Sequence, residues 1–190
     1  MTKARRRPPN PTKAHPRRRK PQPVEKAARA QRLSNQGAEL LQTGRAQEAI
    51  SVLARAYALM PRDVPTAINL GGAYILNKQH KEAIPILERA RDREPENEMV
   101  WINLGAAYLG NPILAQEEQQ LQAIAAFERA LEINPIAKNV HYSLGLIHRD
   151  RGEIEQAIQR FQQAAQADPM DLHARRAVRQ LGEGQDAARE

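Results

Sequence analysis

Three asparagines, Asn35, Asn69 and Asn103, recur at an interval of 34 residues, and Ser143 follows 40 residues later. A carboxamide both donates and accepts hydrogen bonds, so it matches a peptide unit whatever side chain that unit carries. Asparagine is a poor helix former, which makes three in register unfavourable without a use. The alternative is an ordinary polar choice on an exposed surface. We favour a role in binding a polypeptide backbone.

The sequence contains no pattern typical of catalysis. It has no cysteine, which excludes disulfides, thiolate metal sites and thiol nucleophiles. None of its five histidines has a partner at the i+4 spacing of a helical metal site. Gly71-Gly72 lacks the following lysine of a phosphate loop, and the pair Glu117-Glu118 is interpreted as solvated surface. We therefore expect no enzyme, no cofactor and no bound metal.

The segments that would position the asparagines repeat with the same period. Small residues and prolines stand at matching places in four units: Gly37, Gly71, Gly105 and Gly145; Ala49, Ala83, Ala123 and Ala157; Ala56, Ala90, Ala130 and Ala164; Pro61, Pro95, Pro135 and Pro169. A large apolar residue follows the first alanine of each unit, namely Leu53, Leu87, Phe127 and Phe161. Small residues let two helix backbones approach closely, and the proline ends the second helix.

Helical periodicity between these stops predicts four hairpins at about 30–61, 64–95, 98–135 and 138–169, with the first helix beginning near Val24. After Pro169, Leu172, Ala174, Val178 and Leu181 are spaced along one side of a further helix. We interpret this last segment as a helix that caps the fourth hairpin.

The third unit carries the motif in its fullest form. Its residues Trp101, Leu104, Gly105, Tyr108, Ala123, Phe127, Ala130 and Pro135 resemble the tetratricopeptide repeat. The resemblance covers about residues 30–171 and implies an all-α fold, a right-handed α-solenoid of four helix-turn-helix hairpins within a domain at 24–183. We expect repeats at about 30–63, 64–97, 98–137 and 138–171, a capping helix at about 171–182 and a frayed C-terminus at 184–190.

The third unit departs from the pattern by six extra residues between Tyr108 and Ala123. Asn111-Pro112 is expected to end the first helix of this unit. The residues that follow, 113–122, then form either a bulging loop or a lengthened second helix. Neutral drift in an exposed connection is the simpler interpretation of the insertion.

The resemblance implies a concave groove that binds a partner peptide and is lined by the first helix of each unit. In the family's register the ladder Asn35, Asn69, Asn103 and Ser143 faces this groove. The residues expected around it are Ile68, Ile75, Met99, Ile102, Leu109, Tyr142, Leu146 and Arg149. Apolar side chains on an open groove favour an interaction surface over packing, with cover by the N-terminal tail or a second copy as the alternative.

Some members of this family clamp the C-terminal carboxylates of heat-shock chaperones with lysine, arginine and asparagine side chains. The corresponding places here hold Ser34, Ala38, Met99 and Asn103, and only the middle asparagine, Asn69, matches. We therefore expect no recognition of such acidic tails. Arg149 and Arg176 are the groove-side cations.

Two histidines occupy places that hold aromatic residues in the third unit. His141 corresponds to Trp101, and His148 corresponds to Tyr108. We expect both histidines to replace aromatic packing between helices.

The formal charge of +7 is concentrated at the N-terminus. Residues 1–23 carry nine Lys and Arg, six prolines and no acid, whereas residues 24–190 carry 20 bases and 22 acids. A basic, proline-rich segment with little to bury is expected to be disordered. One interpretation is a tether that binds nucleic acid or an anionic surface, and the other is a solubilising terminus. The basic clusters are Arg5, Arg6, Arg7, Arg17, Arg18, Arg19 and Lys20.

These patterns predict a non-enzymatic scaffold or adaptor that binds another protein. The alternatives are a polyanion-associated protein and a structural subunit of a larger assembly. No apolar run reaches the roughly 18 residues that cross a bilayer, and no secretory signal is recognised, so we expect a cytoplasmic protein. The identity of the partner and the oligomeric state stay open.

Overall fold

A computed structural model describes residues 23–112, 114–137 and 139–187, and within them the regular structure is entirely helical. The helices are α1 (Pro23–Gln42), α2 (Ala46–Leu59), α3 (Val64–Leu76), α4 (His80–Arg91), α5 (Glu98–Leu109), α6 (Glu117–Ile133), α7 (Val140–Asp150), α8 (Ile154–Ala167) and α9 (Leu172–Ala187). They form four consecutive hairpins and one terminal helix, the all-α architecture that the repeats predict.

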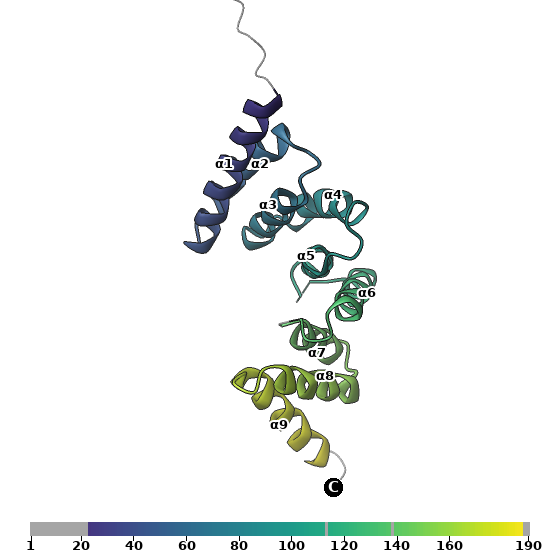
Figure 1. The fold of residues 1–190 in the computed structure, drawn as a ribbon. Helices are drawn as coiled ribbons and strands as arrows, with labels where there is room; N and C mark the ends of the chain where they lie inside the picture. The colour runs from purple at the N-terminus through teal and green to yellow at the C-terminus, as the bar shows by residue number, and fades with distance from the viewer. Residues whose placement is uncertain (1–22, 113, 138, 188–190) are drawn as a thin grey trace, which may run out of the picture.

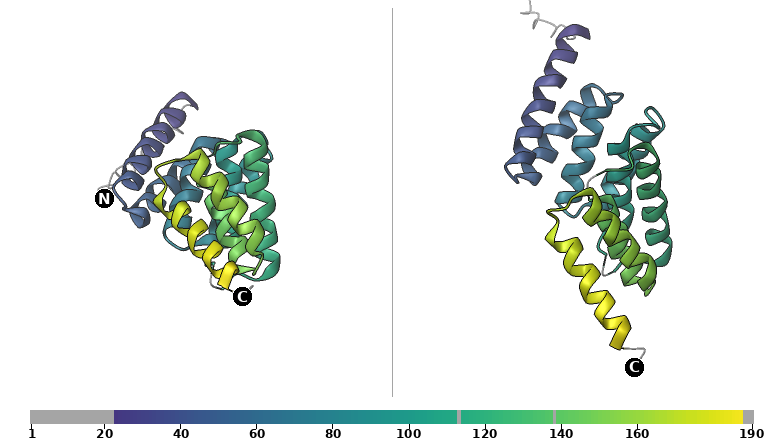
Figure 2. Two further views of the ribbon diagram at one scale, coloured as in Figure 1. Left: turned by 90° about the horizontal axis from the view of Figure 1, so that it is seen from below. Right: turned by 60° about the horizontal axis from the view of Figure 1, so that its bottom comes forward.

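The hairpins stack side by side into an arc, an α-solenoid (Figure 1). In Figure 1, α3 and α5 follow the inner side of the arc, α4 and α6 follow the outer side, and α8 lies beneath α7. The two further views show α1 and α9 at opposite ends of the stack (Figure 2). α9 packs on α8, where Ala174 is fully buried, and so covers the last hairpin.

Each hairpin is closed by a glycine on its first helix that lies against a large side chain on its second. A Cβ added at Gly71 would lie 2.6 Å from Cδ2 of Leu87, and one added at Gly105 would lie 2.6 Å from Cε1 of Phe127. The equivalent contacts are Gly37 with Leu53 and Gly145 with Phe161. The large apolar side chain on the second helix of each hairpin therefore contacts the glycine backbone of the first helix.

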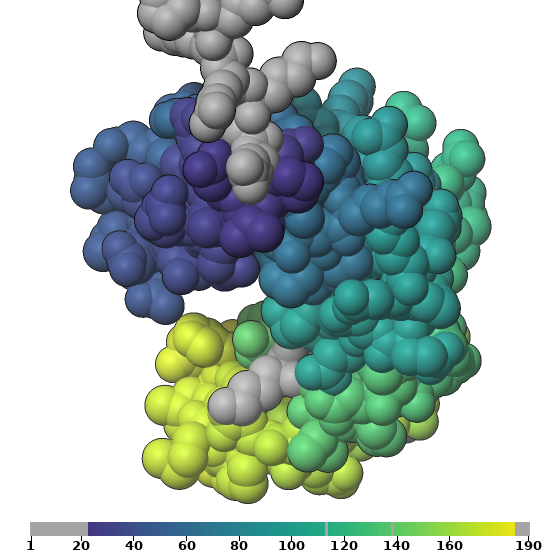
Figure 3. All heavy atoms as spheres, turned by 45° about the horizontal axis from the view of Figure 1, so that its top comes forward, coloured from purple at the N-terminus to yellow at the C-terminus, as the bar shows by residue number. Residues whose placement is uncertain are grey.

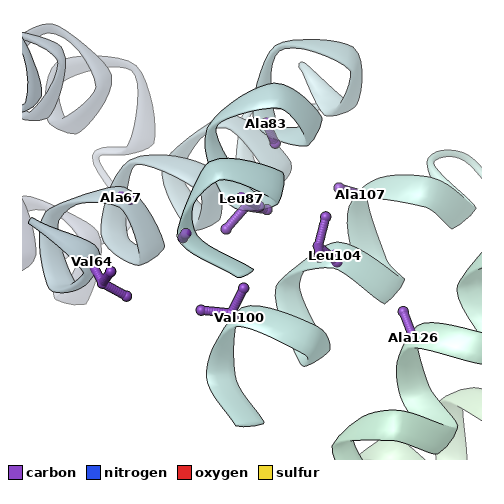
Figure 4. Packing of buried hydrophobic residues seen from close by; sticks show 9 residues of the cluster. Val64, Ala67, Ala83, Leu87, Val100, Leu104, Ala107 and Ala126 are labelled. Carbon is purple, nitrogen blue, oxygen red and sulfur yellow. The ribbon is translucent and has the colours of Figure 1, made fainter. Parts of the chain in front are cut away.

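Buried apolar residues continue this packing from one hairpin to the next. Figure 4 shows Leu87 of α4 beside Leu104 and Val100 of α5, with Ala126 of α6 farther along. Leu87, Leu104 and Val100 have no solvent exposure. Each hairpin thus covers an apolar face of its neighbour, as stacked repeats must.

Polar contacts accompany the packing between units. Arg129 of α6 pairs with Glu96 before α5, and Arg160 of α8 donates to Glu128 of α6 at 2.9 Å. Between α1 and α3, where both residues are buried, Thr66 donates to Ser34 at 2.9 Å. This bond satisfies two hydroxyl groups that would otherwise be buried without partners.

His141 takes over the contact of Trp101. The indole N–H of Trp101 donates to the carbonyl of Pro95 at 2.7 Å, and Nε2 of His141 lies 3.2 Å from the equivalent carbonyl of Pro135. His148 differs from Tyr108, because its ring contacts Glu153 in its own hairpin turn. Tyr108 instead donates to Glu88 of the preceding unit at 3.0 Å.

The C-terminus departs from the prediction. α9 continues to Ala187, beyond the expected end near 182, so residues 184–187 are helical and not frayed. Gly182 and Gly184 do not adopt the positive φ that commonly ends a helix at glycine, and each therefore only weakens the helix. The remaining residues, 188–190, lie outside the described part of the chain.

A charged cluster fixes the turn between α7 and α8 to the start of α6. Glu153 accepts from Arg151 Nε at 2.7 Å and lies 2.6 Å from Nδ1 of His148. Arg151 also donates to Gln120 of α6 at 3.3 Å and lies 3.7 Å from Glu117. Hydrogen bonds from His148 and then from Arg151 lower the pKa of the Glu153 carboxyl, because they stabilise its ionised form.

Two adjacent glycines provide a test of the hairpin contact. We expect Gly71→Ala to destabilise the protein by about 1–3 kcal/mol, because the new Cβ would overlap the buried Leu87. Gly72→Ala, where only Oδ1 of Asn103 comes within 4 Å, should instead stabilise by roughly 0.5–1 kcal/mol. Urea unfolding measures both. Equal stability of the two variants would contradict the close approach of α3 and α4.

Protonation of Glu153 should weaken the fold in acid. A carboxyl whose pKa is lowered on folding contributes stability above its unfolded pKa, and that contribution is lost as the pH falls through the folded value. The wild type and Glu153→Gln should therefore differ less in free energy of unfolding as the pH falls from about 6 to about 3. Glu39→Gln, at a carboxylate without an ion pair among the described residues, is the control. A constant difference would refute the interaction.

Candidate binding groove

The inner sides of α3, α5 and α7 carry a run of uncharged groove places that ends before Arg149. The groove places of these helices hold Pro65, Ile68, Asn69, Gly72 and Ile75; Met99, Ile102, Asn103, Ala106 and Leu109; and Asn139, Tyr142, Ser143 and Leu146. Every one of them is at least partly exposed. Figure 3 shows a notch between the N-terminal helices and the yellow C-terminal end, with the middle of the chain behind it.

The four polar ladder residues differ in how far their hydrogen-bonding groups are used. Asn35 is exposed and accepts from Gln31 at 2.9 Å. The Asn103 amide donates to the carbonyl of Met99 at 3.0 Å, and Ser143 donates to the carbonyl of Asn139 at 2.9 Å. The half-buried Asn69 side chain forms no hydrogen bond with another described residue. Asn69 is therefore the ladder residue with its full donor and acceptor capacity available.

Gly72 lies between Asn69 and Asn103 on this surface. A Cβ at Gly72 would meet only Oδ1 of Asn103, at 3.9 Å, so packing does not require glycine there. Glycine inside a helix is less favourable than alanine, and it suits a site that another backbone approaches closely. In the sequence, Gly71 stood out as a repeat glycine, and the pair Gly71-Gly72 was excluded as a phosphate loop. The signal for Gly72 itself is a second glycine on the open side of the helix.

The apolar groove residues also take part in packing, which corrects the expectation of an interaction surface alone. Ile68 and Ile75 are half-buried against the core of the second and third hairpins, and Ile102 and Leu109 against that of the third and fourth. The ring of Tyr142 contacts that of Phe161, with centroids 5.3 Å apart. Each of these side chains therefore contributes to the packing of the fold as well as to the groove surface.

Two apolar side chains on the inner helices remain largely open to solvent. Met99 is 45% exposed, and Leu76 at the end of α3 is 64% exposed. Leu76 was missed because it lies just beyond the groove places of the repeat register. Both are free to contact a bound chain.

A pocket of about 420 Å³ opens where the groove passes from α5 to α7. Its walls are Leu109, Pro112, Gln120, Ser143, Leu146, Ile147, Arg149 and Asp150. Four of the predicted groove residues meet here, namely Leu109, Ser143, Leu146 and Arg149. Pro112 and Gln120 belong to the insertion and the extended start of α6, and no repeat register could have placed them.

The groove's charge is confined to its C-terminal end. Arg149 donates to Asp150 from Nε at 2.9 Å and from Nη2 at 2.7 Å, so this predicted cation is already paired. Arg176 on α9 is exposed. The predicted basic clusters of the tail lie outside the described residues. A bound segment would therefore meet amides and apolar groups along most of its length.

The described residues contain no group of three or more side chains suited to holding a metal ion. Among the same residues, no helix is long and apolar enough to span a membrane.

Solved structures with the same fold include proteins of distant sequence. A MamA fragment from Desulfovibrio magneticus RS-1 is 23% identical, with a TM-score of 0.66 over 78% of this chain and 81% of that one. TTC0263 from Thermus thermophilus is 21% identical, with a TM-score of 0.70 over 82% of each chain. The first repeat domain of human RPAP3 is 20% identical, with a TM-score of 0.59 over 69% of this chain and 98% of that one. No curated protein sequence matches.

Two sequence models of the tetratricopeptide repeat match the chain, at residues 40–107 and 121–171. The residues between the two matches contain the insertion of the third unit. Together the matches span most of the four hairpins. The repeats, the hairpin packing and these matches establish that the chain belongs to the tetratricopeptide repeat family.

Proposed function

We propose that this chain is a non-enzymatic scaffold that binds a segment of a partner protein along the groove of α3, α5 and α7. Tetratricopeptide repeats serve in general as protein-interaction scaffolds, which supports a protein partner. The observation that carries the proposal is the free Asn69 amide beside Gly72, within a surface that has no charged residue from Pro65 to Leu146 at its groove places.

The chemistry of this surface defines the segment that it binds. The Asn69 side-chain amide would donate to a backbone C=O and accept from a backbone N–H of the bound segment, and Oδ1 of Asn103 would accept from a further N–H. Gly72 would let that backbone come close. Met99 and Leu76 offer exposed apolar contact. Burying a charged side chain without a partner is unfavourable, so the bound segment should be uncharged over this stretch.

The same reasoning argues against the N-terminal tail as occupant of the groove. Residues 1–23 carry nine Lys and Arg. No groove place from Pro65 to Leu146 supplies a carboxylate to pair with them. We therefore favour a segment of another protein over the tail of this one.

Peptides selected from a phage-displayed library of random 12-residue sequences on the full chain provide the probe. Asn69→Ala should weaken their binding about two- to tenfold, the loss expected for one or two backbone hydrogen bonds. Fluorescence anisotropy with the synthetic peptides measures the dissociation constants. Circular dichroism should show an unchanged helical fold.

Gly72→Ala and Gly182→Ala form a matched pair for this proposal. Both place a methyl group on a helical glycine with no atom closer than 3.9 Å, and only Gly72 lies in the groove. Both variants should unfold at higher urea concentration, whereas Gly72→Ala alone should weaken peptide binding. Peptides that bind Asn69→Ala and Gly72→Ala as tightly as wild type would refute the groove assignment.

A second function is favoured by the separation of charge along the chain. We propose that the nine Lys and Arg of residues 1–23 bind polyanions independently of the groove. Such binding depends on counterion release, so it is independent of sequence and weakened steeply by salt.

Deletion of residues 1–22 removes no residue of α1 to α9 and isolates the contribution of the tail. The full chain should bind a labelled single-stranded RNA of mixed sequence with an affinity that falls linearly in log–log plots against salt. The truncated chain should lose this binding and keep its peptide binding. RNA binding that survives the deletion, or that ignores salt, would contradict this second function.

A further inference from the structure

The third unit cannot make the turn that joins the helices of the other hairpins. Gly44, Lys78 and Gly152 stand seven residues after the hairpin glycine in their units and have φ values of 72°, 60° and 77°. The corresponding residue of the third unit is Pro112, whose ring holds φ near −65°. A three-residue turn of the usual shape is therefore excluded here.

The insertion replaces that turn. Gly110 takes a φ of 59° at the end of α5, and residues 110–116 then separate α5 from α6, where the other hairpins have three connecting residues. α6 also begins six residues before Ala123, whereas α4 begins three residues before Ala83. The insertion thus forms both a longer loop and a longer second helix, the two alternatives that the sequence left open.

The longer connection coincides with a wider junction between inner helices. The backbones of α1 and α3 approach closely, as do those of α3 and α5, whereas α5 and α7 make hardly any such approach. The pocket of about 420 Å³ occupies this junction, with Pro112 and Gln120 on one side and Ser143 and Leu146 on the other. The α3–α4 connection, by contrast, has only three residues, 77–79.

The pocket is apolar and its charged groups are paired. Leu109, Leu146 and Ile147 provide apolar wall, and the guanidinium of Arg149 is held by Asp150. Gln120 is held by Arg151 of the α7–α8 turn, which fixes the insertion side of the pocket. Such a site favours a neutral apolar group over a charged one.

The insertion's own exposed leucines do not fill the pocket. Leu114 is 74% exposed and Leu121 is 50% exposed, and neither lines the cavity. Both side chains thus leave this volume open at the edge of the groove.

We propose that this insertion-built pocket receives one large apolar side chain of the segment bound in the groove. It sets the register of the bound segment relative to Asn69 and Asn103. The inference rests on the proposed function, and it adds that the partner segment carries a Leu, Met, Phe or Trp anchor. A few side chains buried in well-packed pockets carry most of the binding energy of an interface.

The experiment uses the same random 12-residue phage library on the full chain. Enriched peptides should share one position occupied by Leu, Met, Phe or Trp, with few charged residues beside it. Changing that position to Ala in a synthetic peptide should weaken binding about ten- to a hundredfold, the effect of losing one buried apolar side chain. Anisotropy titrations measure the loss.

Ser143→Leu fills the pocket from α7, and Ser143→Ala is the matched control that leaves the volume open. Ser143→Leu should weaken binding of the parent peptide by a similar factor. In this variant the anchor-to-Ala change should have no further effect, because both changes remove the same contact. Gln120→Leu fills the volume from α6 and provides the same test if Ser143→Leu does not fold. In Ser143→Ala the pocket stays open, so the anchor-to-Ala change should keep its full effect on binding.

The outcomes separate the two levels of the proposal. Two outcomes would refute the pocket proposal while the groove proposal stands. In the first, peptides depend on Asn69 but share no apolar position. In the second, the anchor-to-Ala change weakens binding to both filling variants as much as it weakens binding to the wild type. A library without any peptide dependent on Asn69 would overturn the groove and the pocket with it.

Discussion

The bare backbone of one glycine in each hairpin lies against a leucine or phenylalanine of the partner helix. Gly71 has no room for a Cβ beside Leu87, and Gly105 has none beside Phe127. This contact determines which side of each first helix faces its second helix. Residues advance by about 100° along an α-helix, so Asn69, two positions before Gly71, lies on nearly the opposite side. Close packing inside the hairpin thereby places the carboxamide on the groove side.

Gly71 and Gly72 are neighbours, but they have different structural roles. Gly71 permits the contact with Leu87, and its replacement by a larger residue would force α3 and α4 apart. Gly72 is turned by about 100° toward the groove, where nothing fills the space of its missing side chain except Oδ1 of Asn103. A helix normally favours alanine at such a site. Packing explains the first glycine, and the proposed approach of another backbone explains the second.

The third hairpin keeps the packing of the others while changing its connection. Phe127 still lies against Gly105, so the pair α5 and α6 is closed in the usual way. Pro112 prevents the short turn, and the added residues lengthen both the loop and α6. Arg151 and Glu153 then hold the start of α6 to the turn after α7. The altered connection thus supplies Pro112 and Gln120 as one wall of the pocket between the third and fourth units.

The hairpins and their order could be predicted from the sequence, because they depend on residues spaced within one or two helical turns, and four repeats show the same spacing. The sequence did not predict that Ile68 and Ile75 are half-buried, that Asn103 bonds to Met99, or that Pro112 and Gln120 line a pocket with Leu146. These features arise only from the packing of separate units. Exposure and cavity shape depend on distances between separate units, and a spacing along the chain does not contain those distances.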